Sequence, residues 1–117
     1  MPPEIRKFLY DIQSACQALE QFIDGKTLDD YQADLLLRSG VERQLTIIGE
    51  ALNQALRVDP TLAEKVSSIR QIINFRNVAV HGYSTVENET VWGILQNDLP
   101  KLHDEVRTLL SEETDRP

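Results

Sequence analysis

The sequence is short of the residues on which several kinds of small protein depend. Its single cysteine, Cys16, excludes an internal disulfide framework and a zinc site built from several cysteines. Five glycines and five prolines among 117 residues are too few for a loop-rich or fibrous chain. No apolar run approaches the roughly 18 residues of a membrane span, and no basic region followed by an apolar one opens the chain. These absences favour one globular domain in the cytoplasm, away from any membrane.

Positive charge is scarce as well. The chain has 12 lysines and arginines against 19 acidic residues, a net charge of −7. Because phosphate contacts need clustered cations, this balance argues against general nucleic-acid binding. Residues 61–81 are the exception, since Lys65, Arg70 and Arg76 are accompanied there by one acid, Glu64. This stretch is either a chance fluctuation or a place where the chain meets an anion.

Hydrophobic residues recur at helical spacing along most of the chain. They predict helices at about 5–23, 34–57, 69–81, 87–96 and 99–110. Gly25 is placed to end the first helix, and the segment Thr27 to Asp30 resembles a capping box. Pro100 predicts a break before the last helix. We therefore predict an all-α, up-down bundle of about five helices, with a single domain over residues 1–110 and a polar, frayed tail over 111–117.

Three small residues lie within the two longest helices. Cys16 is on the apolar stripe of the first, which favours a packed core residue over a reactive thiol. Gly40 and Gly49 lie inside the second, where a glycine costs about 1 kcal/mol relative to alanine. Their presence there indicates that another backbone comes close.

The helix at 69–81 does not fit a plain bundle. Its apolar stripe runs through Ile69, Ile72 and Ile73 and then reaches Arg76. A charge on a core stripe needs a carboxylate, an anion or water beside it. Glu50 is a candidate partner for Arg76, and the alternative is that the arginine extends to the surface.

Arg76, Asn77 and His81 have the side chains that RNA phosphodiester cleavage uses. Histidine transfers protons near neutral pH, and arginine holds a phosphate and stabilises developing negative charge. Asn77 can orient the scissile group or the histidine. Asn77 and His81 share a helix face, whereas Arg76 converges on His81 only if the chain bends near Gly82. The structural alternative is a helix-terminal histidine bonded to a carbonyl.

The segment Arg76-Asn77-Val78-Ala79-Val80-His81-Gly82-Tyr83 resembles the R-N-x-x-x-H-x-Y signature of HepT-like proteins, a branch of the HEPN superfamily. Residues 9–12, 42–51 and 91–102 resemble further segments of that family, so the likeness covers nearly the whole chain. The resemblance implies a HEPN-like, homodimeric helical bundle in which the R-x4-H motifs meet in a cleft between subunits. Phe75 and Val78, a second apolar edge of the helix at 69–81, independently indicate a second subunit.

The resemblance also implies a function. It points to a metal-independent, cofactor-free endoribonuclease that acts as the toxin of a bacterial toxin–antitoxin pair. By that resemblance Arg76 and His81 are the catalytic pair, and Asn77 is a polar accessory. Tyr83 is then the residue to which a nucleotidyltransferase antitoxin of the MntA type transfers AMP and so silences the toxin. The implied partners are RNA, a second copy of the chain and this antitoxin.

Two alternatives stand beside the ribonuclease. The chain could be a non-catalytic helical partner or substrate-binding subunit of a nucleotidyltransferase, or a plain helical oligomer with a paired core arginine. The intact pair of Arg76 and His81 favours the ribonuclease, because a scaffold does not need it. Two histidines and scattered carboxylates show no metal-ligand spacing.

Overall fold

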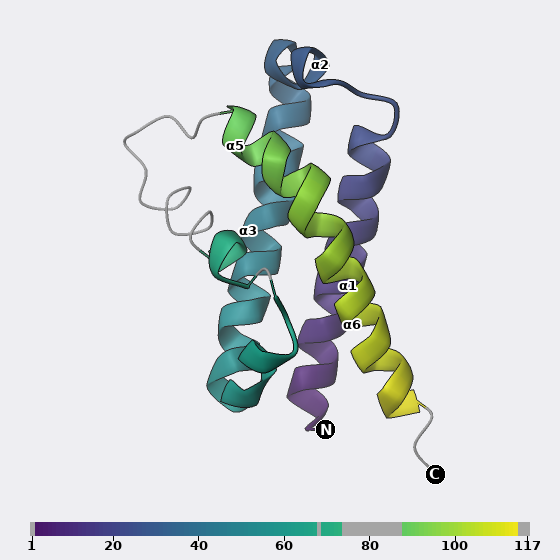
Figure 1. Cartoon of the computed structure of the whole chain (residues 1–117), viewed down its shortest axis with the longest axis vertical. Coiled ribbons are helices and arrows are strands. Elements are labelled where there is room, and N and C mark those ends of the chain that lie inside the picture. The colour runs from purple at the N-terminus through teal and green to yellow at the C-terminus, as the bar shows by residue number, and fades with distance from the viewer. Residues whose placement is uncertain (1, 68, 74–87, 115–117) are drawn as a thin grey trace.

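The computed structural model describes residues 2–67, 69–73 and 88–114, and the regular elements in these ranges are all helical. They are α1 (Pro3–Ile23), α2 (Leu28–Ala33), α3 (Leu35–Val58), the 3-10 helix η1 (Pro60–Glu64), a helical turn at 69–73, α5 (Asn88–Gly93), the π-helical turn η2 (Ile94–Asp98) and α6 (Leu99–Thr114). The chain rises through α1 and descends through α3, and α5, η2 and α6 then descend across both (Figure 1). The predicted all-α helical bundle is confirmed.

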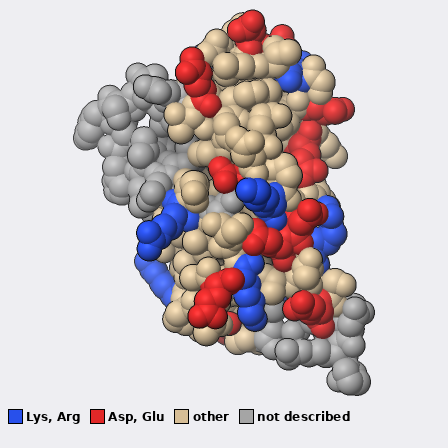
Figure 2. Space-filling model, viewed as in Figure 1, with Lys and Arg blue, Asp and Glu red and all other residues tan. Residues whose placement is uncertain are grey.

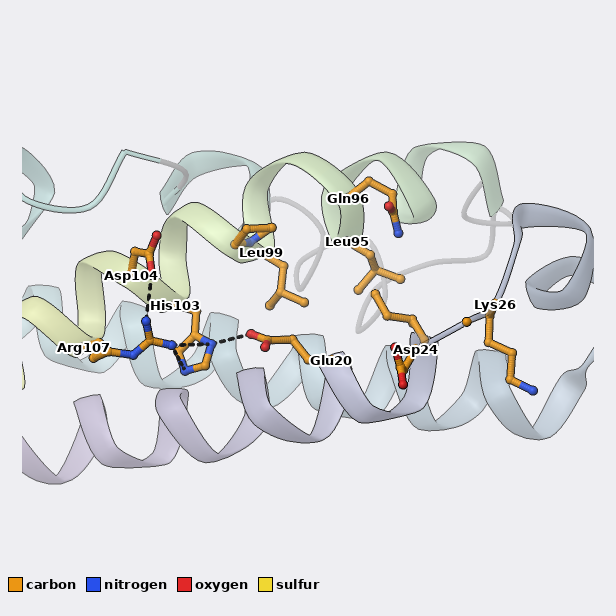
Figure 3. A pocket seen from close by; sticks show the side chains of 12 residues that line it. Glu20, Asp24, Lys26, Leu95, Gln96, Leu99, His103, Asp104 and Arg107 are labelled. Atoms are coloured by element: carbon orange, nitrogen blue, oxygen red, sulfur yellow. Dashed lines mark hydrogen bonds and ion pairs between the residues drawn. The ribbon is translucent and has the colours of Figure 1, made fainter.

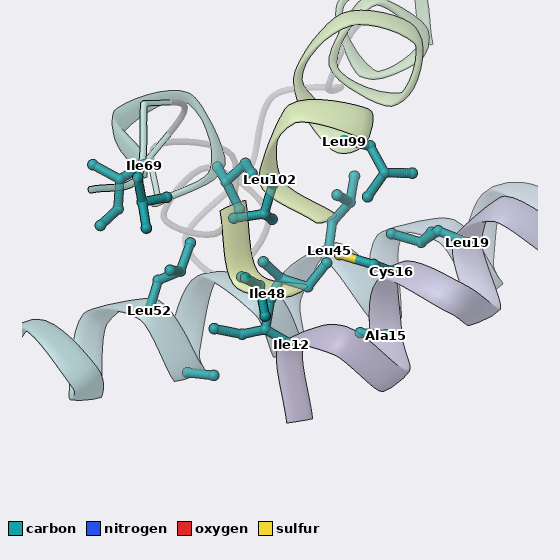
Figure 4. Close-up of a cluster of buried hydrophobic side chains, with 14 of the residues drawn as sticks. Ile12, Ala15, Cys16, Leu19, Leu45, Ile48, Leu52, Ile69, Leu99 and Leu102 are labelled. Carbon is teal, nitrogen blue, oxygen red and sulfur yellow. The ribbon is translucent and has the colours of Figure 1, made fainter. Parts of the chain in front are cut away.

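The apolar stripes predicted for the long helices form the core. α1 and α3 pack against each other along most of their length, and α6 packs against α1. Figure 4 shows side chains of these helices interdigitating with Ile69 of the short turn at 69–73. The buried hydrophobic residues that α1, α3 and α6 contribute are Ile5, Leu9, Ile12, Ala15, Cys16, Leu19, Val41, Leu45, Ile48, Ala51, Leu52, Ala55, Leu99, Leu102, Val106, Leu109 and Leu110.

Local capping signals set the ends of the first three helices. Gly25 adopts φ +71°, a conformation that glycine reaches without strain, and the chain leaves α1 there. The predicted capping box is present, because Thr27 Oγ1 accepts from Asp30 N and Asp30 Oδ2 accepts from Thr27 N. It starts the short helix α2. The long helix α3 has its own cap, since the Asp34 side chain accepts from Leu37 N at 3.1 Å.

The predicted break before the last helix is wrong. Residues 88–114 form one continuous helical rod, and the turn that precedes Pro100 is π-helical (Figure 1). Leu99 N donates to Ile94 O across this wider turn. Because proline has no N–H and its ring crowds the preceding carbonyls, a π turn lets the helix pass it without stopping. The rod also continues to Thr114, so the first four residues of the polar tail 111–117 are helical.

The close neighbour of Gly40 is an aromatic ring and not a backbone. A Cβ atom at position 40 would lie 3.2 Å from Phe22 Cε2, inside ordinary van der Waals contact. Gly40 therefore lets the ring of Phe22 rest on α3, and the expectation that another backbone approaches here is corrected.

Tyr31 is a core residue that the sequence pattern did not indicate. Its side chain is fully buried, and its ring lies 5.6 Å from that of Trp92 in α5, centroid to centroid. The hydroxyl has no hydrogen-bond partner among the described residues. Burial raises the pKa of Tyr31 to about 12, so the phenol stays neutral. The ring therefore joins α2 to α5 by packing against Trp92.

We expect Tyr31→Phe to stabilise the fold or leave it unchanged. A buried hydroxyl without a partner costs about 1–3 kcal/mol, and phenylalanine keeps the ring while removing that oxygen. Urea unfolding of both proteins measures the difference. Tyr10→Phe, at a tyrosine that is 45% exposed, is the matched control and should change nothing. A clear loss of stability in Tyr31→Phe would show that the hydroxyl does have a partner.

Candidate functional site

The predicted catalytic residues lie in a part of the chain that the structure does not describe. Arg76, Asn77, His81 and Tyr83 all fall within residues 74–87, so their geometry stays a prediction. Glu50, the candidate partner of Arg76, lies in the described part, half-buried in the middle of α3. What the structure shows of this site is therefore its supports on either side along the chain.

The support before the signature is the helical turn at 69–73. Ile72 is fully buried and Ile69 nearly so, while Ile73 packs against the core from a half-buried position. Arg70 and Gln71 are exposed on the other side of the turn. The predicted apolar stripe is thus confirmed up to residue 73. These isoleucines pack the turn, which comes just before the signature in the chain, against the bundle.

A polar contact to α6 lies two residues before this turn. The backbone N–H of Ser67 donates to Glu105 Oε2 at 2.9 Å, and the Ser67 hydroxyl donates to Glu105 Oε1 at 3.0 Å. Glu105 belongs to α6, 38 residues further along the chain. One carboxylate of α6 therefore accepts from both donors of Ser67, an exposed residue two positions before the turn. We call this pair the Ser67–Glu105 clamp.

The support after the signature is α5 and the π turn that follows it. Val91, Ile94 and Leu95 are buried in the same hydrophobic core as Ile72. Trp92 stacks at a tilt on Tyr31 of α2. Both flanks of the undescribed segment are therefore anchored in one core.

A second cluster of titratable groups, which the sequence reasoning missed, links α1 to α6. His103 is 5% exposed, and its Nδ1 contacts Oε1 of Glu20 on α1. Arg107 Nη2 lies 3.5 Å from Nδ1 and 3.3 Å from Nε2 of His103, and its Nη1 is 3.0 Å from Asp104 Oδ1 (Figure 3). The sequence could have indicated that His103 is buried, because it lies on the apolar stripe of α6 beside Leu102.

This cluster lines one end of an open pocket of about 480 Å³. The pocket lies between the end of α1, the loop that follows it, and the η2–α6 stretch (Figure 3). Leu95 and Leu99 supply apolar surface, and Asp24 and Lys26 stand at its other end. A nearly buried imidazole held by an acid and a guanidinium has little access to a substrate. The arrangement therefore fits a tether between helices better than a general acid or base.

Cys16 is the other candidate nucleophile, and its surroundings keep it unreactive. Burial, helped by the charge of Glu20, raises the pKa of the Cys16 thiol to about 12. The thiolate needed for nucleophilic attack is therefore scarce near neutral pH. The prediction that Cys16 is a packed core residue is confirmed.

The described ranges show no grouping of three or more His, Cys, Asp or Glu side chains that could hold a metal ion. In the same ranges no helix is both long and apolar enough to cross a membrane. Figure 2 shows lysines and arginines interleaved with acids on the face it presents, without an extended basic surface among the residues it colours. Metal independence and a cytoplasmic location stay predictions.

The all-α bundle agrees with the fold that the resemblance to HepT-like proteins implies. The model of the family described as "Ribonuclease HepT-like" matches residues 12–109. The chain therefore belongs to the ribonuclease HepT-like family of the HEPN superfamily, as its signature predicted, and its enzyme class is that of an endoribonuclease.

Named relatives agree with the family. "Putative RNase MJ1380" of Methanocaldococcus jannaschii is 27% identical over 88% of this chain and 94% of that protein. "Probable ribonuclease HepT" of Thermococcus cleftensis is 28% identical over 83% of this chain and 87% of its own length. "Gamma-glutamylcyclotransferase and putative RNase MJ0434" of M. jannaschii is 25% identical over 96% of this chain, which spans half of that protein. No solved structure matches significantly.

The raised pKa of Cys16 predicts that stability falls at alkaline pH. The folded state keeps the thiol proton up to about pH 12, whereas the unfolded chain loses it near the ordinary value of 9.0. Above that value the unfolded state binds fewer protons, so the free energy of unfolding drops by up to about 1.4 kcal/mol per pH unit. Cys16→Ala should lack this component.

Denaturant unfolding of the wild type and of Cys16→Ala, at pH 8 and at about pH 10, measures this pH-dependent loss of stability. The wild type should lose about 1.4 kcal/mol more than Cys16→Ala between the two conditions. Equal losses in the two proteins would contradict the buried, protonated state of the thiol.

Proposed function

We propose that this chain is the toxin of a toxin–antitoxin pair and cleaves RNA without a metal, using Arg76 and His81 in a cleft between two copies of the chain. One observation carries the proposal. The ribonuclease family match spans residues 12–109 and includes an intact R-x4-H signature whose two flanks are anchored in the core. The antitoxin would be a nucleotidyltransferase.

The proposed chemistry needs one acid–base group and one cation. The 2′-oxygen of a ribose attacks the neighbouring phosphorus, the bond to the 5′-oxygen breaks, and a 2′,3′-cyclic phosphate and a 5′-hydroxyl result. His81 takes the proton from the 2′-hydroxyl or gives one to the leaving oxygen. Arg76 holds the phosphate and stabilises the negative charge that grows on it. Asn77 orients the scissile group or the histidine.

The acidic chain meets RNA through its least acidic stretch. Lys65 and Arg70 are exposed and stand just before the signature in the chain. A homodimer brings two such stretches to one cleft and doubles the cations available to phosphates. The apolar edge of Phe75 and Val78, predicted from the sequence, supplies the surface on which the two copies would meet. This arrangement supports local contacts to a substrate and not a broad RNA-binding face.

We expect purified wild-type protein to cleave RNA in the presence of EDTA. His81→Ala and Arg76→Ala should each lower the cleavage rate by about 10²- to 10⁴-fold, as the loss of a positioned catalytic group does. Gel analysis of a labelled RNA, with detection of the cyclic phosphate end, measures rate and chemistry together.

Arg43→Ala is the matched control, because it removes an exposed arginine from α3. It should leave the rate close to that of the wild type. Cleavage that needs an added divalent ion, or that His81→Ala leaves unchanged, would defeat the proposal. An inactive wild type would favour a non-catalytic partner of the nucleotidyltransferase.

Control of the toxin would run through Tyr83. Each AMP transferred to its hydroxyl adds a phosphodiester, and so a negative charge, two residues from His81. A charge pair at about 4 Å has a Coulomb energy of roughly 4 kcal/mol at an effective dielectric of about 20, before desolvation. The added phosphate therefore competes with the RNA phosphate for Arg76, and the nucleotide blocks the cleft.

We expect co-expression with the cognate nucleotidyltransferase to add one or more AMP units to the wild type and abolish its nuclease activity. Tyr83→Phe should gain none and stay toxic, whereas Tyr10→Phe, at an exposed tyrosine of α1, should be modified and silenced like the wild type. Intact-mass spectrometry and a growth assay give both readouts. Silencing of Tyr83→Phe without modification would show that the antitoxin acts by covering the toxin instead.

A further inference from the structure

The helical rod formed by residues 88–114 has three weak points close together, between Gly93 and Pro100. Gly93 has helical backbone angles, φ −59° and ψ −42°, and a Cβ atom there would meet nothing within 4 Å. No close contact therefore requires a glycine, although glycine favours a helix less than alanine does. The π turn η2 follows at once, and Pro100 then provides no N–H for the carbonyls of that turn. Glycine, π turns and proline are the features at which helices bend.

The two sides of this stretch are held differently. α6 packs against the long helix α1 and buries Leu102, Val106 and Leu109 in the core. α5 has only six residues, and among the described elements its main neighbour outside the rod is α2, which is itself six residues long. A bend between Gly93 and Pro100 would therefore move α5 and leave α6 in place.

The contact between α5 and α2 includes an unfavourable contribution. Tyr31 of α2 is fully buried and stacks at 40° on the half-buried ring of Trp92, while Val91 is buried beside it in the core. The Tyr31 hydroxyl has no hydrogen-bond partner among the described residues. Closing α5 on α2 therefore removes apolar surface from water, which is favourable, and also removes a hydroxyl from water without replacing its bonds, which is unfavourable. The hydroxyl regains water when the two helices separate.

We propose that α5 is a hinged arm. It bends away from α2 at the hinge Gly93–Pro100 while α1, α3 and α6 stay packed, and in its open state it exposes Tyr31 and Trp92 to water. Leu95 and Leu99 of the hinge also line the open pocket beside the end of α1 (Figure 3). Movement of the arm therefore changes the shape of that pocket.

The test is native-state hydrogen exchange of the backbone amides in the full chain, followed by NMR. After correction for intrinsic rates, the amides of residues 92–99 should exchange at least about tenfold faster than the slowest amides of α6, because opening the arm costs less than unfolding the molecule. Their protection should change little in low concentrations of urea, since the bend exposes little surface.

Two variants should close the arm, and two controls should not. Gly93→Ala should raise the protection of residues 92–99 by about two- to fivefold, which is the preference of a helix for alanine over glycine. Tyr31→Phe should raise it by at least about fivefold, because the closed state no longer buries an unpaired hydroxyl. Thr108→Ala strengthens the exposed side of α6 beyond the hinge and should raise only the protection of the slowest α6 amides. Tyr10→Phe, at an exposed tyrosine of α1, should change neither group.

Two results would overturn the hinged arm. If residues 92–99 are as well protected as the slowest amides of α6, or respond equally to Thr108→Ala, then α5 opens only when the whole molecule unfolds. If Gly93→Ala and Tyr31→Phe both leave the protection of residues 92–99 unchanged, then neither the glycine nor the buried hydroxyl controls the opening. None of these measurements uses RNA, so the nuclease assignment stands or falls separately.

Discussion

The apolar seam between α1 and α3 is the contact on which the rest of the molecule depends. Ile12, Leu45 and Ile48 are fully buried along it, and each such side chain contributes about 1.5–3 kcal/mol by leaving water. α6 closes the seam from one side. Ile72 and Val91, which flank the undescribed signature, enter the same cluster. The segment with the proposed chemistry is therefore flanked on both sides by residues of this core.

Two polar contacts turn this non-directional core into a defined arrangement, and both involve α6. The contact of His103 with Glu20 ties α6 to α1, and the Ser67–Glu105 clamp ties it to the turn at 69–73. Apolar packing resists separation of helices but resists rotation and sliding less, whereas hydrogen bonds have preferred angles. α6 thus relates the first helix to the segment that leads into the signature. The π turn before Pro100 lets α5 continue into α6 as one helical rod. The segment before the signature contacts this rod through Ser67 and Glu105, and the segment after the signature is the start of the rod itself.

Much of the fold could be predicted from the sequence, because the core stripes of α1, α3 and α6 follow helical spacing and the caps at Thr27 and Gly25 act locally. The continuous helix through Pro100 could not, since a proline signals a break unless the wider turn before it is known. The burial of Tyr31 and the hydrogen bonds that Ser67 donates to Glu105 depend on partners far away in the chain. For the site, the sequence identified the residue types at 76–83 and their family, and the structure adds the two anchored flanks.

The net negative charge of the chain affects how strongly the proposed nuclease would bind RNA and how easily a modification would block that binding. For each phosphate neutralised, the affinity for single-stranded nucleic acid falls by about 0.7 logarithmic units per tenfold rise in salt concentration. A chain with few cations therefore binds weakly and with little salt dependence. With a net charge of −7 and only a short basic stretch, the chain would have little attraction for RNA beyond the proposed cleft. Arg76 would then supply a large share of the hold on the scissile phosphate. A single phosphodiester at Tyr83 would compete for Arg76 and remove that share of the binding. One modification would then be enough to silence the enzyme, whereas a more basic chain would still bind RNA through its other cations. The same scarcity makes orientation important, because a substrate held by few contacts reacts only when the catalytic groups are already in place.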